Sequence, residues 1–245
     1  MDATIGIIFL DSDANCLAQH RMVLPDAVRI VAEPVVLQDG IVTNAALAAM
    51  FDSDQLEVAA RRLAERGARE ILFACTSGSL INGVGWDRVL VERIEGASGV
   101  RGTTTTTAVL EAFRVLGART ISIGTPYLAE VDERERAFFE QLGFAVATIE
   151  GLGCSTDPEI GALTPETVVA LAERVNRPEA DIVFLSCTSL NVAQEIDRIE
   201  DAIGKPVVTS NQASAWLLMN HLGIEPHDGL FGTLMTKRIE DEVSV

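Results

Sequence analysis

Two stretches of the chain end in the same three residues, and those residues could do chemistry. Residues 71–77 read ILFACTS, and residues 182–189 read IVFLSCTS. Each is an apolar run of strand length that ends in Cys-Thr-Ser, and Cys75 and Cys187 stand 187 − 75 = 112 positions apart in a chain of 245 residues. Two thiols that face one small molecule can remove a proton, deliver a proton or add to a double bond. The repeat therefore predicts a site built on two cysteines.

The position of each cysteine favours this interpretation over simple packing. A continuous apolar run is typical of a strand buried on both faces, and ligands of open α/β sheets bind beyond the carboxyl ends of such strands. Thr and Ser favour helix N-termini, where free N–H groups suit a carboxylate. We expect the helix dipole at this junction to lower the thiol pKa from its usual value of about 8.5. A lone strand cysteine would instead be a small buried hydrophobe.

Short apolar runs alternate with longer helical patterns, which predicts βαβ units and parallel sheets. The predicted strands are 4–10, 29–36, 70–75, 119–124, 144–149, 181–186 and 206–209. The predicted helices are 54–67, 103–117, 127–142, 164–176, 191–203 and 211–222.

The two halves of this pattern look alike. We predict an α/β fold of two similar Rossmann-like lobes with parallel sheets, related by a pseudo-twofold axis, with the active site in the cleft between them. Lobe one is expected to hold residues 1–100 plus 208–245, and lobe two residues 101–207. The alternative is one continuous doubly wound sheet in which the repeated string is a coincidence.

Composition limits the partners. The chain carries 36 acidic and 19 basic residues, a net charge of −17, so we expect no nucleic-acid and no membrane partner. It has no apolar segment of about 18 residues and no basic region at its start, and its four cysteines show no Cys-x-x-Cys spacing, so we expect a cytoplasmic protein with free thiols. Metal-ligand spacing and nucleotide motifs are absent, so we expect no metal and no cofactor. We also expect a homo-oligomer, either a dimer or a tetramer.

The two Cys-Thr-Ser strand ends resemble those of the aspartate/glutamate racemase superfamily. Residues 124–131 (GTPYLAEV), 185–187 (LSC) and 205–211 (KPVVTSN) are similar to segments of the branch that holds maleate cis-trans isomerases and arylmalonate decarboxylases. Relatives encoded with ectoine breakdown are also similar. The resemblance covers most of the chain. It implies a two-lobed α/β fold that uses no cofactor and holds a small carboxylate substrate between its lobes.

The resemblance also implies roles for particular residues. In the isomerases, the cysteine that matches Cys75 adds to the substrate double bond, and the one that matches Cys187 delivers a proton. The decarboxylases keep only the second cysteine, so a chain with both resembles an isomerase. The residues that match the carboxylate-binding positions, or lie directly beside them, are Thr76, Ser77, Tyr127, Thr188 and Ser189.

Two aspartates depart from the isomerase pattern. The isomerases have an asparagine where this chain has Asp13, with Asn15 two residues further on, and again where it has Asp157. An ionised aspartate would repel the second carboxylate of maleate and would attract an ammonium or amide group. The alternative is that these acids cap the helices that follow them.

We therefore predict a cofactor-independent isomerase that acts on a small carboxylate through two cysteines, with maleate-to-fumarate conversion first. An amino-acid or hydantoin racemase of the same superfamily is the first alternative. A non-catalytic relative that binds small carboxylates is the second.

Overall fold

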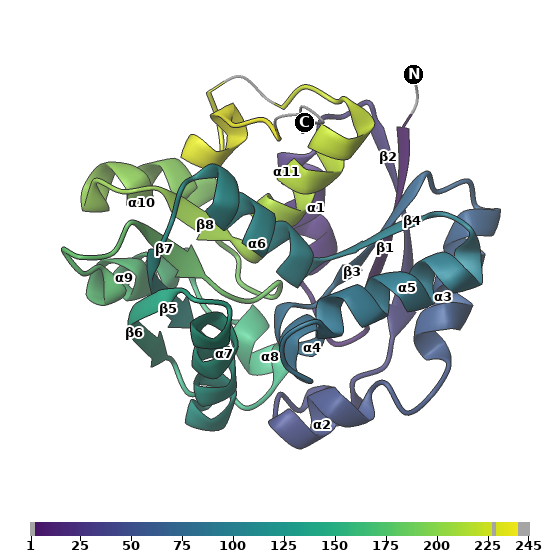
Figure 1. Cartoon of the computed structure of the whole chain (residues 1–245), viewed down its shortest axis with the longest axis horizontal. Coiled ribbons are helices and arrows are strands. Elements are labelled where there is room, and N and C mark those ends of the chain that lie inside the picture. Colours follow the sequence, from purple (N-terminus) through teal and green to yellow (C-terminus); the bar gives the residue numbers. More distant parts are fainter. Residues whose placement is uncertain (1–2, 227–228, 240–245) are drawn as a thin grey trace.

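The computed structural model describes residues 3–226 and 229–239 and contains two four-stranded parallel sheets (Figure 1). The strand orders are β2-β1-β3-β4 and β6-β5-β7-β8, so equivalent strands occupy equivalent places. This arrangement confirms the predicted pair of similar α/β lobes. The strands are β1 (Ala3–Leu10), β2 (Val28–Val35), β3 (Glu70–Ala74), β4 (Arg101–Thr104), β5 (Thr120–Thr125), β6 (Ala145–Gly151), β7 (Ile182–Leu185) and β8 (Val207–Thr209).

Helices connect the strands and cover the sheets. They are α1 (Cys16–Val23), α2 (Asn44–Ala49), α3 (Gln55–Glu65), α4 (Thr76–Leu80), α5 (Trp86–Ser98), α6 (Thr105–Val115), α7 (Ala129–Gln141), α8 (Asp157–Gly161), α9 (Pro165–Val175), α10 (Ile196–Ile203) and α11 (Ser210–Leu222). Short 3-10 turns lie at Gln38–Gly40, Ala193–Glu195 and Thr233–Thr236.

The central strands and the amphipathic helices follow the sequence pattern. Every residue of β3 and of β7 is buried, as a continuous apolar run predicts. In α3 the buried side chains fall on one stripe, namely Leu56, Ala59, Ala60 and Leu63. That stripe attaches the helix to the first sheet and leaves its charges in water.

The threonine run differs from its prediction. We expected a helix over 103–117, but Thr103 and Thr104 complete β4, and α6 begins only at Thr105. The Thr104 side chain accepts a hydrogen bond from the Thr107 N–H and caps the helix. β-Branched residues suit a strand and a hydroxyl suits an N-cap, so one run of threonines ends one element and starts the next.

Other elements escaped prediction, most of them short. No helix was predicted at α1, α2, α4, α5 or α8, and the predicted helix 191–203 is a 3-10 turn followed by α10. Helices of five or six residues such as α4 and α8 are too short to show a 3.6-residue period.

Two helices cross between the lobes. Phe113 of α6, which follows a strand of the first sheet, packs against Phe184 of β7 in the second sheet, with ring centroids 5.5 Å apart. Helix α11 follows β8 of the second sheet and packs against β3 and α1. The two helices also contact each other at the centre of the molecule (Figure 1). Strand β4 belongs to the first sheet and strand β8 to the second. The division into residues 1–100 plus 208–245 and residues 101–207 remains a prediction.

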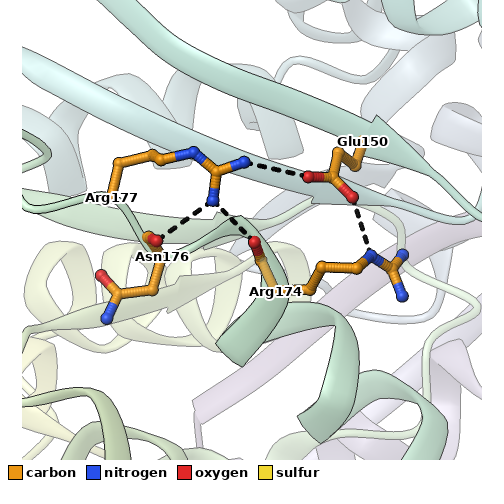
Figure 2. A network of polar contacts seen from close by, with 4 residues as sticks. All are labelled: Glu150, Arg174, Asn176 and Arg177. Carbon is orange, nitrogen blue, oxygen red and sulfur yellow. Dashed lines mark hydrogen bonds and ion pairs between the residues drawn. The ribbon is translucent and has the colours of Figure 1, made fainter.

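A polar network on the second lobe secures its edge strand (Figure 2). Glu150 of β6 accepts hydrogen bonds from Arg174 Nε at 2.7 Å and Arg177 Nη2 at 3.1 Å. Arg177 Nη1 also donates to the main-chain oxygens of Arg174 and Asn176, at the end of α9. Arg177 thus binds carbonyls at the end of the helix, and both arginines tie β6 to α9. Within the described ranges, no helix is long and apolar enough to cross a membrane.

Candidate active site

Cys75 stands where β3 ends and α4 begins. It is the N-cap of α4, and its Sγ accepts a hydrogen bond from the Gly78 N–H at 3.3 Å. A Cβ added at Gly78 would lie 2.9 Å from that sulfur. A glycine is therefore needed here, because it lets the thiol lie directly against the first turn of the helix. Only 2% of Cys75 is exposed.

Cys187 occupies the equivalent place after β7, but its backbone is different. Its φ angle is 140°, a conformation that residues with a Cβ rarely adopt, whereas φ at Cys75 is −157°. Such strain persists only where neighbouring groups hold it, and it clusters at functional sites. Here the Cys187 N–H donates to Ser210 Oγ at 3.0 Å, and Cys187 Sγ accepts from the Ser189 N–H at 3.4 Å.

Three hydrogen bonds connect the loops after β1 and β3 to the Cys187 loop and the start of α11. Thr76 Oγ1 donates to Ser210 Oγ at 2.7 Å, and Thr188 Oγ1 donates to Asp13 Oδ2 at 2.8 Å. Asn15 Nδ2 donates to the carbonyl of Ser189 at 2.8 Å. The carboxyl ends of β1, β3, β7 and β8 therefore meet at one buried interface.

Tyr127 lies at this interface just before α7. It is 2% exposed. The nearby Tyr127 hydroxyl lowers the pKa of Cys187 and opposes a larger rise caused by burial. Ser77 is also close to a sulfur, with its Oγ 3.9 Å from Cys75 Sγ.

Asp13 both caps a helix and reaches the cysteine loop. Its Oδ1 accepts from the N–H groups of Asn15 and Cys16 at 3.0 and 2.9 Å, at the start of α1, while its Oδ2 binds the hydroxyl of Thr188. The sequence left two alternatives for Asp13, a helix cap or a residue of the site. One carboxylate oxygen caps the helix and the other contacts the cysteine loop.

Asp157 approaches the same loop from lobe two. Its oxygens accept from Ser12 Oγ at 2.6 Å and from Ser189 Oγ at 3.3 Å. Asp13 and Asp157 are both buried, and no ion pair to either is present in the described part of the chain. Burial raises the pKa of Asp157 to about 6, and the charge of Asp13 adds to that rise.

The thiols are less acidic than the sequence led us to expect. Burial raises the pKa of Cys75 to about 12, and it raises the pKa of Cys187 well above its usual value. The charges of Asp157 and Asp13 raise both further, while the N–H groups of Gly78 and Ser189 lower them. The expected lowering is therefore wrong in direction for the closed site, because desolvation and two carboxylates outweigh the N–H groups at the helix start.

A strap from lobe one helps to close the interface. The segment between β2 and α3 crosses to lobe two, where the Val42 N–H donates to the Ser155 carbonyl at 2.9 Å and Ile41 forms an antiparallel bridge to Thr156. Asn44 Nδ2 donates to the Glu130 carbonyl at 3.0 Å.

Sequence reasoning missed several residues of this interface. Ser210 and Asn211 open α11, and Asn211 Nδ2 donates to the Thr188 carbonyl at 2.8 Å. Ser12, which binds Asp157, was also missed. Residues 205–211 stood out only as a segment that resembles the family. Nothing local in that segment indicates a contact with Thr76, which is 134 positions away.

Fold and site together define a two-lobed α/β protein with one cysteine at an equivalent strand end of each lobe. The family model described as arylmalonate decarboxylase matches residues 5–235, so the chain belongs to that family. The chain is 32% identical over 159 residues to arylmalonate decarboxylase of Bordetella bronchiseptica, an alignment that covers 64% of this chain and 66% of that protein. It is 28% identical over 159 residues to maleate isomerase of Alcaligenes faecalis, covering 62% and 63% respectively. Both alignments span slightly less than two thirds of the relative's length.

Solved structures share the fold over nearly the whole chain. A liganded double mutant of arylmalonate decarboxylase superposes with a TM-score of 0.86 at 29% identity, covering 95% of this chain and 98% of that one. A cysteine-to-serine mutant of the Nocardia farcinica maleate cis-trans isomerase carries a covalently bound succinylcysteine intermediate. It superposes with a TM-score of 0.88 at 21% identity and the same coverage.

Proposed function

We propose that the protein is a cofactor-independent isomerase that converts maleate to fumarate through Cys75 and Cys187. The observation that carries the proposal is the presence of a thiol at both equivalent strand ends, with the two loops joined at one buried interface through Ser210. The similarity to maleate isomerases, one of which forms a succinylcysteine, supports the same chemistry.

The proposed reaction needs the two thiols in different states. Cys75 first loses its proton to solvent, and the resulting thiolate adds to one alkene carbon while Cys187 gives its proton to the other. The central carbon–carbon bond is then single and can rotate. Cys187 takes the proton back, the carbon–sulfur bond breaks, and the double bond returns in the trans form. The different backbones of the two cysteines suit this division of roles.

The proposed substrate-binding residues are Thr76, Ser77, Tyr127, Thr188, Ser189, Asp13, Asn15 and Asp157. In the closed structure the hydroxyl hydrogens of Thr188 and Ser189 are donated to Asp13 and Asp157. A substrate carboxylate must therefore displace these contacts or use the remaining donors. Both aspartates accept hydrogen bonds from protein groups, so an ionised aspartate favours a ligand group that donates over a second carboxylate.

A second candidate is a racemase for an amino-bearing carboxylate, and one observation favours it. Two buried carboxylates approach the Cys187 loop without a cationic side chain at ion-pair distance in the described residues. Buried charge is costly unless it is paired, and a substrate ammonium would supply the missing partner. In this reaction one cysteine removes the proton alpha to the carboxylate and the other delivers one from the opposite face.

Proton NMR in D2O tests both candidates together. Maleate, aspartate, glutamate, hydantoins and diaminobutyrate derivatives are each incubated with the protein, and alkene geometry and alpha-proton exchange are followed. We expect fumarate to form, and both Cys75→Ser and Cys187→Ser to slow it by at least about a hundredfold, the low end for a positioned acid–base group. Alpha-proton exchange without fumarate would favour the racemase. Carboxylate binding without either reaction would favour a non-catalytic relative.

We also propose a cytoplasmic location and a homo-oligomeric state. All four cysteines are unpaired, which supports a reducing compartment. Size-exclusion chromatography with light scattering measures the oligomeric state directly.

A further inference from the structure

One hydroxyl group lies between the two cysteine loops. Ser210, the first residue of α11, is completely buried. Its Oγ accepts hydrogen bonds from Thr76 Oγ1 at 2.7 Å and from the Cys187 N–H at 3.0 Å. Since Thr76 directly follows Cys75, this single oxygen joins the loop of one thiol to the backbone of the other.

The hydrogen of that hydroxyl has no acceptor. A serine hydroxyl has one hydrogen to donate and two lone pairs that accept. Thr76 and Cys187 occupy both accepting positions of Ser210, and across residues 3–226 and 229–239 no group accepts the Ser210 hydrogen. A buried donor without a partner costs free energy, which an anionic ligand would recover.

The hydrogen available to a ligand therefore belongs to Ser210 and not to Thr76. The sequence placed Thr76 among the groups that bind a substrate carboxylate, but its hydrogen is donated to Ser210. We propose that Ser210 binds the substrate carboxylate through its own hydroxyl hydrogen while it holds the Cys187 backbone in its strained conformation. The nature of the substrate rests on the proposed function, whereas the contact between Ser210 and a carboxylate does not require turnover.

The equivalent residue of the other lobe lacks these contacts. Thr105 is the first residue of α6, and its Oγ1 donates to the Phe73 carbonyl at 3.5 Å and accepts from Ser214 Oγ at 3.4 Å. Neither partner belongs to the loop that begins at Cys75. The contact made by Ser210 is therefore a property of the Cys187 side and not a repeated requirement of the fold.

Alkylation tests the proposal without any assumption about the reaction. Iodoacetate carries a carboxylate and iodoacetamide is its neutral analogue, so the ratio of their rates at Cys75 and Cys187 reports carboxylate binding beside the thiols. We expect Ser210→Ala to lower the iodoacetate-to-iodoacetamide ratio by about tenfold, the effect of one hydrogen bond to a charged group. Ser214→Ala is the matched control on the same helix, because its single hydroxyl hydrogen lies between the Ser210 carbonyl at 2.8 Å and Thr105 Oγ1 at 3.4 Å and contacts neither cysteine loop. An unchanged ratio in Ser210→Ala overturns the proposal.

Maleate kinetics with succinate as inhibitor give a second measurement. We expect Ser210→Ala to lower kcat/KM and to raise the inhibition constant of succinate, each by about tenfold. A merely structural role would reduce the active fraction and leave the inhibition constant as in the wild type, and that result would contradict the proposal. If Ser210→Ala does not fold, Ser210→Cys replaces it in these kinetics. A thiol is of similar size but donates weakly, so we expect the same tenfold changes in kcat/KM and in the inhibition constant. A wild-type protein that does not isomerise maleate overturns the proposed function, while the alkylation ratio still decides the role of Ser210.

Discussion

The carboxyl group of Asp157 titrates close to neutral pH, so its charge can be varied in an experiment. Burial raises its pKa to about 6, well above the usual value of about 3.9. The group is therefore neutral below pH 6 and ionised above it. Neutral Asp157 has a proton to offer a dianionic substrate, whereas ionised Asp157 repels one.

Asp157→Asn should therefore change maleate turnover in a pH-dependent way. Above pH 6 we expect kcat/KM for maleate to rise by about tenfold in the variant. A tenfold change corresponds to about 1.4 kcal/mol, which the loss of one nearby like charge can supply. Below pH 6 the difference from the wild type should shrink, because wild-type Asp157 is then also neutral. Asp201→Asn, at an exposed position on α10, is the control for a change of net charge. A lower kcat/KM for an amino-bearing substrate in Asp157→Asn would instead support the racemase candidate.

Single residues could be predicted where the local sequence carries their signal. The placement of Cys75 and Cys187 at strand ends was predicted from the apolar runs before them, as was the proximity of Asp13 and Asp157 to the first turn of a helix, while the catalytic roles of the cysteines stay a prediction. Ser210 was not found, because its role depends on a contact with the other lobe. The thiol pKa was predicted in the wrong direction, since the degree of burial is decided by the packed lobes and the strap.

Helix α7 contains a buried acid, Glu135, that should make the stability of the fold depend on pH. Glu135 is completely buried, no cationic side chain lies at ion-pair distance in the described ranges, and burial raises its pKa to about 8. The nearby charge of Asp132 adds to the rise. Since the pKa is about 4.3 in an unfolded chain, the neutral acid favours the folded state at low pH. That contribution is fully present below pH 4 and is lost as the pH rises towards 8.

Glu135→Gln should remove this pH dependence. Between about pH 4.3 and 8 we expect the wild type to lose about 1.4 kcal/mol of unfolding free energy per pH unit relative to the variant. Urea denaturation of both proteins at several pH values measures the difference. Glu133→Gln, an exposed change on the same helix, should follow the wild type at every pH. Parallel curves for Glu135→Gln and the wild type would mean that Glu135 is ionised throughout.

Elements were predictable where their apolar pattern is regular, and length alone was not enough, since the 13-residue helix α5 was not predicted. The strands of continuous apolar sequence and the long amphipathic helices α3 and α9 were found, with ends shifted by at most two residues. Strand β4 was hidden because its threonines also suit a helix N-terminus, and pairing with β3 decides the outcome. Helix α11 is buried over most of its surface, which follows from its place between the lobes.

At the scale of the whole molecule, the two lobes are joined around the site. The hydrophobic core forms two clusters, and each contains residues from both sheets. The pseudo-twofold arrangement could be predicted because the sequence repeats. The crossing of α6 and α11 between the lobes could not be predicted, because no local pattern indicates which sheet a helix covers. The strap over residues 36–54 bridges the two lobes, and Cys75 and Cys187 are only 2% and 6% exposed.

A ligand that occupies the interface should therefore stabilise the closed strap. We expect succinate to slow hydrogen exchange of the Val42 amide, because that N–H is bonded to Ser155 of the other lobe. The Val28 amide, bonded to Pro25 within lobe one, should exchange at the same rate with and without succinate. Equal exchange of Val42 in both conditions would show that the strap does not respond to the ligand.

The central claim is that Cys75 adds covalently to the substrate, and that Cys187 donates a proton to the adduct and later removes it. Peptide mass spectrometry of the Cys187→Ser variant, incubated with maleate and quenched in acid, tests it most directly. Without the Cys187 thiol, solvent supplies the proton that completes the adduct, and the step that removes this proton and releases fumarate should be slow. We predict a mass increase of one maleate on the peptide that contains Cys75, and none on the peptides of Cys16 or Cys154. No adduct on Cys75, from a preparation whose wild-type form produces fumarate, would contradict the account.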